Sequence, residues 1–179
     1  MGGGSFIPRQ QNWKWFQNDA AEPTTSLAAE NTSPVLADSN IIRLRVTIAE
    51  TGGKGASGQS TDILYSSDLV SWFSMSASND WNYANGQATG GNTVTTNKLS
   101  DTSNKQKYHE SSTVTETWSA STAYEEDWAI QPTIHAKAGT IYYFFIAIAG
   151  VEASPNTGKV RPSLTTAITS KGNFFDLFP

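Results

Sequence analysis

Two histidines are the first candidates for acid–base or nucleophilic chemistry, because imidazole titrates near neutral pH. His109 stands beside Glu110 in a polar stretch, and His135 falls on the outward-facing positions of a predicted strand. The chain has no Gly-x-Ser-x-Gly motif of the kind that presents a nucleophilic serine. Serine is so abundant that a Ser–His pair cannot be inferred without geometry. The histidines therefore predict no hydrolase.

Three consecutive carboxylates, Glu125, Glu126 and Asp127, are the second candidate group. Successive side chains of a strand point to opposite faces, so Glu126 shares the inward face with Tyr124 and Trp128. Glu125 and Asp127 are expected to face outward. Glu126 is thus the one carboxylate in an unexpected place. It could pair with an arginine inside, lie at the frayed start of the strand, or act as a catalytic acid.

Residue spacing predicts no metal and no cofactor. There is no cysteine to supply thiolate ligands, no His-x-His pair and no acidic loop with calcium spacing. The glycine-rich stretch 52–58 resembles a phosphate loop only superficially, because Gly55 rather than Ser or Thr follows Lys54. No helical pattern follows this stretch, so we expect a mobile loop between two strands. These observations together favour a protein that is not an enzyme.

Composition and charge restrict the partners. The net charge is -4, whereas a general nucleic-acid binder needs a basic face. The first eight residues lack a basic stretch leading into an apolar one, so they do not read as a secretory signal. Charged residues make up only 16% of the chain, so most of the surface must be Ser, Thr, Asn, Gln and Gly. That mixture favours strands and turns.

The stretch 138–149 organises the predicted fold. Apolar residues occupy successive positions there, which is typical of a strand covered on both faces. It is too short to cross a bilayer, which takes roughly 20 residues, so no membrane partner is expected. Its Gly139-Thr140 entry followed by aromatic residues resembles the start of strand F in immunoglobulin-like sandwiches. We therefore expect a central strand, paired on both sides, with Tyr142 or Tyr143 at a corner.

Alternating apolar residues predict the other strands. Within 42–49, one face is apolar, while Arg43 and Arg45 are expected to point outward into solvent. Further strands are predicted over 24–29, 62–65, 70–75, 112–118, 124–136 and 160–168. The predicted fold class is an all-β, antiparallel β-sandwich, Ig-like or jelly-roll-like, over residues 13–169. A flexible N-terminal arm over 1–12 and an apolar C-terminal tail over 170–179 complete the chain.

Aromatic and apolar side chains at the ends of the chain are the candidate partner contacts. Trp13 and Trp15 share one face of a first strand, and core packing is the favoured interpretation. An aromatic anchor for a partner or a sugar is the alternative. The tail could fold back on its own domain or dock on another copy. The predicted partner-binding residues are Phe6, Ile7, Trp13, Trp15, Phe174, Phe175, Leu177 and Phe178.

Trp81 and Tyr83 are candidate glycan contacts. They lie in a polar stretch with Asn79, Asp80 and Asn82, and such residues stack on sugars and hydrogen-bond to them. The same residues would also form an ordinary loop over one end of a sandwich, and that interpretation is favoured.

The order of motifs resembles a β-sandwich module of tailed-phage virion proteins and large prokaryotic surface proteins. The matching segments are Trp13-Lys14-Trp15, Asn18-Asp19, Glu22, Leu27 to Thr32, Arg43-Leu44-Arg45, Thr95 to Ser100, Tyr124, Tyr142 to Phe144 and Arg161 to Thr165. Ala20-Ala21 follows Asp19 where Gly-Ser is usual in that module. The resemblance implies no catalytic residues and a structural or adhesive role.

The expected function is a non-enzymatic virion structural protein, either a capsid decoration, a head-auxiliary or a tail component. It would be assembled in the host cytoplasm and would bind other copies of itself and other virion proteins through its termini. A carbohydrate-binding module or surface adhesin is the alternative, and a hydrolase is the third hypothesis.

Overall fold

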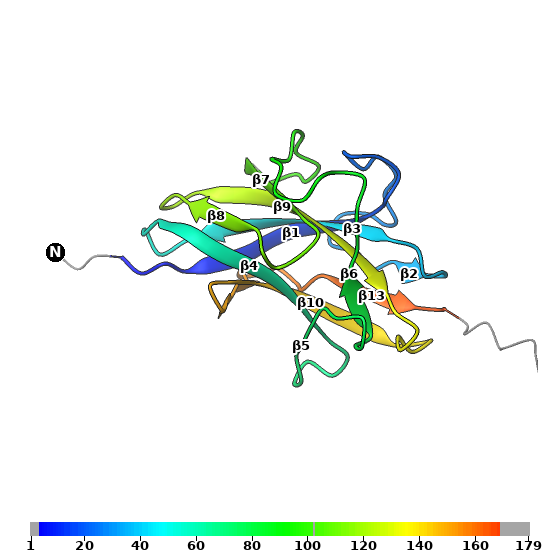
Figure 1. The fold of residues 1–179 in the computed structure, drawn as a ribbon. Coiled ribbons are helices and arrows are strands. Elements are labelled where there is room, and N and C mark those ends of the chain that lie inside the picture. Colours follow the sequence, from blue (N-terminus) through cyan, green and yellow to red (C-terminus); the bar gives the residue numbers. More distant parts are fainter. Residues whose placement is uncertain (1–3, 102, 169–179) are drawn as a thin grey trace, which may run out of the picture.

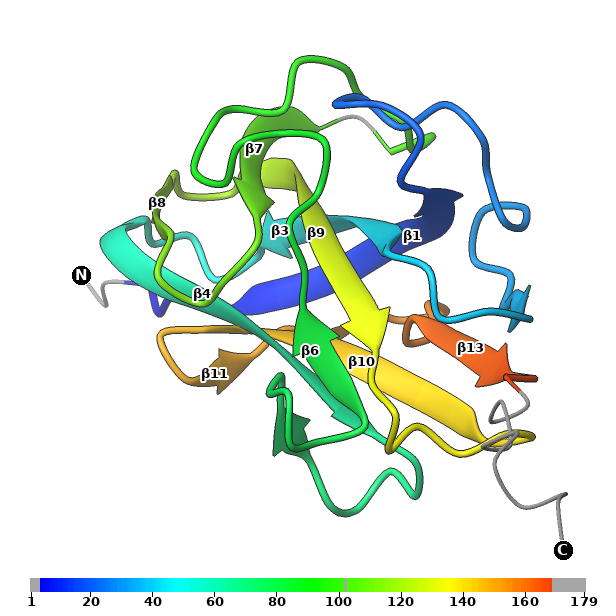
Figure 2. The ribbon, with the colours of Figure 1, turned by 45° about the vertical axis from the view of Figure 1, so that its right-hand side comes forward.

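The structure, a computed structural model, describes residues 4–101 and 103–168. Two mixed β-sheets pack face to face, with β1, β3 and β9 of one sheet lying above β10 and β13 of the other (Figures 1 and 2). Those residues contain no helix. The predicted all-β sandwich is therefore confirmed.

The first sheet runs in the order β12, β1, β3, β9 and β6. β7 also pairs with β9, ahead of β6 along the strand. Its strands are β1 (Pro8–Gln17), β3 (Ile42–Glu50), β6 (Trp81–Tyr83), β7 (Asn104–His109), β9 (Ala123–Pro132) and β12 (Ser154–Pro155).

The second sheet runs in the order β2, β13, β10, β4 and β5. β8 pairs with β4, and β11 pairs with β10. Its strands are β2 (Val35–Leu36), β4 (Ala56–Ser66), β5 (Phe73–Ser74), β8 (Thr115–Trp118), β10 (Ile141–Ile148), β11 (Val151–Glu152) and β13 (Ser163–Thr166). Most strand pairs are antiparallel, as predicted, whereas β1 with β12, β2 with β13 and β7 with β9 are parallel.

Alternation along the strands builds the core, because one face of each central strand is apolar. In β3, Ile42, Leu44, Val46 and Ile48 are at most 2% exposed. In β10 the inward residues are equally buried. Removing this apolar surface from water is the main favourable contribution to folding, at about 25 cal/mol per Å².

The strand predicted as central, β10, is paired on both edges, by β13 and β4. The corner is Tyr142, whose hydroxyl accepts the N–H of Lys137 at 3.0 Å and donates to Asp80 at 2.8 Å. Only one face of β10 is fully covered, however. On the other face Ile141 is 47% exposed and Phe145 is half-buried against Trp72.

The ends of several elements differ from the sequence predictions. Residues 8–12, expected in a flexible arm, form the beginning of β1, where Pro8–Gln10 pairs with β3. The strand predicted over 24–29 is irregular, with a single bridge between Phe16 and Ser26. Short polar segments of this kind have too few apolar residues to specify a strand by themselves.

The stretch 52–58 is a loop followed by the beginning of β4 at Ala56. Gly52 is required there, because a Cβ at this position would lie 1.8 Å from the carbonyl oxygen of Ser5. The glycine thus serves the close approach of the N-terminal segment, and not a phosphate.

Candidate functional site

The outer face of the first sheet carries a buried ionic network, although Arg43 and Arg45 were predicted to be solvated. That prediction is wrong: the two residues are 1% and 0% exposed. Segments 18–22 and 95–99 fold over them, as the hydrogen bond from Arg45 to the carbonyl of Thr96, at 2.9 Å, illustrates. An apolar/polar alternation does not distinguish a solvated face from one covered by a loop.

Asp127 is the centre of this network. One of its oxygens accepts Nε of Arg43 at 2.6 Å, and the other pairs with Nε of Arg45. The Nη atoms of Arg45 contact Glu125 at 2.9 Å and Glu22 at 2.6 Å. Glu125 and Asp127 were expected to face solvent, but both are fully buried. Charge-assisted hydrogen bonds of this kind offset the cost of removing the ions from water.

The carboxylates also bind the covering loop. Glu125 accepts the N–H groups of Lys98 and Leu99 at 2.8–3.3 Å. Burial raises the pKa of Glu125, and these donors together with Arg45 only partly oppose it. Burial alone would raise the pKa of Glu22, but hydrogen bonds from Thr95 and other donors outweigh it and hold that pKa well below its usual range. The network therefore fastens this loop to the sheet.

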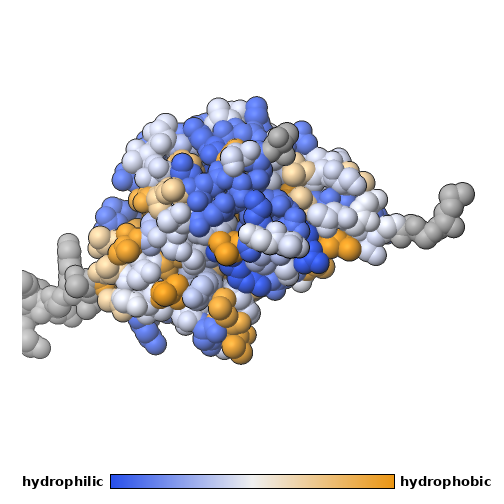
Figure 3. Space-filling view, turned by 180° about the vertical axis from the view of Figure 1, so that it is seen from behind, coloured by the Kyte–Doolittle hydropathy of each residue, from blue (hydrophilic) through white to orange (hydrophobic). Residues whose placement is uncertain are grey.

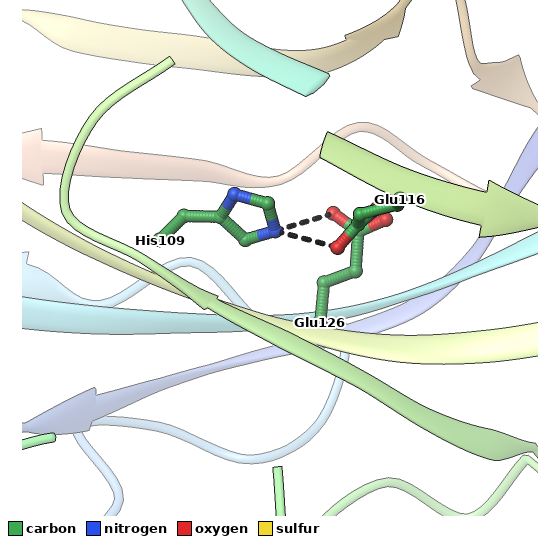
Figure 4. A group of neighbouring side chains, drawn as sticks. All are labelled: His109, Glu116 and Glu126. Atoms are coloured by element: carbon green, nitrogen blue, oxygen red, sulfur yellow. Dashed lines mark hydrogen bonds and ion pairs between the residues drawn. The ribbon is translucent and has the colours of Figure 1, made fainter. Parts of the chain in front are cut away.

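A second buried cluster joins His109, Glu116 and Glu126 from β7, β8 and β9 (Figure 4). Nε2 of His109 lies 3.0 Å from Oε1 of Glu116 and 3.7 Å from Oε2 of Glu126. Figure 4 shows both contacts reaching the same ring nitrogen. All three side chains have no solvent exposure, so the cluster lies inside the sandwich.

Neighbouring side chains fix the cluster in place. The ring of Trp128 stacks on His109 at 3.8 Å, and its Nε1 donates to Glu126 at 3.1 Å. The hydroxyl of Thr61 donates to Glu116 at 3.1 Å. Burial, followed by the charge of Glu116, raises the pKa of Glu126 well above its ordinary value. Two polar atoms, Oε1 of Glu126 and Nδ1 of His109, are buried without a hydrogen-bond partner among the described residues.

The sequence partly anticipated this cluster. Glu126 was recognised as an inward carboxylate, whereas His109 was assigned to a polar loop and Glu116 was missed. A usable signal was present: Glu116 and Glu126 each stand two residues before a buried tryptophan, Trp118 and Trp128. In a strand that spacing puts the carboxylate on the same inward face as the indole.

The predicted partner contacts near the N-terminus divide into two kinds. Trp13 and Trp15 are 1% and 0% exposed, so they pack in the core, which was the favoured interpretation, and offer no surface to a partner. Phe6 is half-buried, with its ring 6.4 Å from that of Trp118. Ile7 is 39% exposed. The tail residues Phe174, Phe175, Leu177 and Phe178 lie outside the described residues.

The candidate glycan contacts do not form a sugar-binding surface. Trp81 is fully buried and packs edge-on against Tyr142 and Phe144 at 5.6 and 5.3 Å. Tyr83 is half-buried, and its hydroxyl donates to Asp62. Both side chains therefore pack within the domain. The segment is strand β6, paired with β9, and not the predicted loop over one end of the sandwich.

An apolar strip lies on the outer face of the second sheet. Ile141 stands opposite Thr165, and Thr165 stands opposite Val35, so the three share one face. Val35 is 66% exposed and Ile141 is 47% exposed, while Phe145 is half-buried under Trp72 with ring centroids 4.6 Å apart. We call the following residues the outer strip: Val35, Leu64, Ile141, Tyr143 and Phe145.

Comparison of the chain with protein-family models, with curated proteins and with solved structures finds no match. In the part of the chain that the structure describes, no helix has the length and apolar character needed to cross a membrane.

Proposed function

We propose that this protein is a non-enzymatic structural module that associates with other copies of itself. In this proposal the C-terminal segment of one copy contacts the outer strip of a second copy. The observation that carries the proposal is the alignment of Val35 and Ile141, 66% and 47% exposed, on one face of the sheet, in strands β2 and β10 on either side of β13. Exposed apolar residues that gather in this way mark contact sites.

The segment beyond β13 has a composition that suits this surface. Residues 170–179 include Phe174, Phe175, Leu177 and Phe178. The described chain ends at Ile168, two residues past β13, which is the strand between Val35 and Ile141. Reciprocal exchange of two such segments would bury both segments and both strips, as in a two-fold symmetric dimer.

Hydrophobic residues occupy only limited areas of the molecular surface, as expected for a protein with a small contact site. In the view of Figure 3, hydrophilic residues cover much of the upper half, and hydrophobic residues form separate areas, mostly over the lower half. Two groups of ionisable side chains, one around Asp127 and one around His109, are buried and hold strands and loops together. This arrangement favours a structural role over a catalytic one.

We propose that this association takes place in a virion. This part of the proposal rests only on the order in which the sequence motifs occur along the chain. The protein would then serve as a capsid decoration, a head-auxiliary or a tail component. A capsid or portal gene next to its own gene would support this setting, and a neighbourhood of metabolic genes would contradict it. The carbohydrate-binding alternative would need residues other than Trp81, because that side chain is fully buried.

Sedimentation of the full chain over a range of concentrations tests the self-association. We expect reversible formation of dimers or larger assemblies, and a shift to monomer in Ile141→Asp and in Phe175→Asp. Ile134→Asp is the matched control, because Ile134 is 95% exposed but lies in the connection between β9 and β10, outside the outer strip. A wild-type chain that stays monomeric at its highest soluble concentration would refute the proposal.

A further inference from the structure

We propose that His109, Glu116 and Glu126 bind a divalent transition metal ion, with Zn²⁺ as the probe, and that the ion clips the two sheets together from inside. Among the described residues, these three bring one nitrogen and two carboxylate oxygens within 4.8 Å of one another. Imidazole and carboxylate are ordinary ligands of Zn²⁺. This inference is independent of the proposed self-association.

The spacing of the donor atoms suits such an ion. With Zn–N and Zn–O bonds of about 2.0–2.2 Å, neighbouring ligands of a tetrahedral site lie about 3.3–3.6 Å apart. The distances from Nε2 of His109 are 3.0 Å to Glu116 and 3.7 Å to Glu126, on either side of that range. Movements of a few tenths of an ångström would bring these atoms into coordination geometry.

The charge of the cluster and one unsatisfied carboxylate oxygen also favour a cation. Two carboxylates and one divalent ion are neutral together, whereas two carboxylates alone in an apolar interior carry a large desolvation cost. Oε1 of Glu126 is fully buried and has no hydrogen-bond partner within residues 4–101 and 103–168. As a second oxygen from the same carboxylate, it could complete a four-donor site with no solvent ligand.

Hydrogen bonds to the ligands form a supporting shell. Thr61 donates to the Glu116 oxygen that does not face His109, and Trp128 donates to Glu126, both at 3.1 Å. Partners of this kind orient ligands in established metal sites. His109 and Glu126 belong to the first sheet and Glu116 to the second, so one ion would join the short β8 to the opposite sheet.

The buried position determines how an ion would enter. The three side chains have no solvent exposure, so exchange through the folded protein would be slow. Binding would instead accompany folding, as in structural zinc sites. The test therefore starts from unfolded protein.

Wild-type protein is unfolded in denaturant with a chelator, then refolded with either Zn²⁺ or chelator and freed of excess ion by gel filtration. We expect one zinc per chain after refolding with Zn²⁺, together with a higher melting temperature than that of the chelator sample. Glu116→Gln and Glu126→Gln preserve side-chain volume and are expected to lose both effects. His135→Gln, which replaces an exposed histidine, is expected to keep both.

The proposal is overturned if wild-type protein retains no zinc, or if the two glutamine variants retain as much as wild type. Refolding of wild-type protein with Co²⁺ gives a test that does not depend on the variants folding. Visible absorption bands of Co²⁺ in a site of low symmetry would support the proposal, and a spectrum indistinguishable from that of free Co²⁺ would overturn it.

Discussion

Replacing Arg45 by an uncharged residue should destabilise the fold, because buried carboxylates would lose their positively charged partner. Arg45→Met would remove the partner of Glu22 and Glu125 and leave Asp127 with Arg43 alone. Methionine fills much of the space of the arginine stem but leaves the carboxylates buried. Removing one partner of a buried ion pair costs about 3–5 kcal/mol. For a chain of this size that cost corresponds to a fall of about 6–20 °C in melting temperature.

Urea unfolding followed by tryptophan fluorescence measures this cost. Lys54→Met is the control, because Lys54 is exposed and such surface changes usually stay within about 0.5 kcal/mol. The double variant Arg45→Met with Glu125→Gln should lose less than the sum of the single variants, because the two side chains are in contact. A loss for Arg45→Met no larger than that for Lys54→Met would refute the argument that this network is buried and structural.

Three further substitutions test other parts of the fold. Tyr142→Phe removes the corner hydroxyl and leaves Asp80 without its donor, so we expect a loss of about 1–3 kcal/mol in urea unfolding. Burial opposes ionisation of Glu50, but four backbone N–H groups outweigh it and lower its pKa. The stability that Glu50 supplies is therefore complete above the unfolded pKa of about 4.3 and falls as the pH drops through the lower native value. Glu50→Gln should be less stable than wild type at pH 7, with the difference shrinking towards low pH, and a constant difference in pH-dependent unfolding would contradict this. Gly52→Ala should displace the segment at Ser5, seen as faster hydrogen exchange of the N-terminal residues while β10 is unaffected.

Sequence periodicity was sufficient to predict the core residues and the central strand. Ile42, Leu44, Val46 and Ile48 alternate with polar residues, and a strand of that pattern has one buried face wherever it lies in a sandwich. The apolar run of β10 likewise placed it between two neighbours. These signals are local, so they can be read from the sequence without knowledge of the tertiary structure.

The buried polar clusters could not be predicted in the same way. The alternation of β3 puts Arg43 and Arg45 on the face away from the core. The two segments that cover this face are distant in the sequence: Glu22 stands 23 residues before Arg45, and Thr96 stands 51 residues after it. The cluster at His109 has the same difficulty, because it forms only when β8 joins one sheet while β7 joins the other. Long-range topology, and not local pattern, decides both cases.

Disulfide trapping between two copies tests the proposed association most directly. The chain contains no cysteine, so Ile141→Cys and Phe175→Cys each introduce a single thiol. Mixing the two variants under mild oxidation should give a cross-linked dimer that contains one chain of each, while Ile134→Cys mixed with Phe175→Cys should give far less. A double variant with both Ile141→Cys and Phe175→Cys tests the alternative that the segment folds back on its own copy. If only this variant forms a disulfide, and forms it within one chain at high dilution, the proposed association is contradicted.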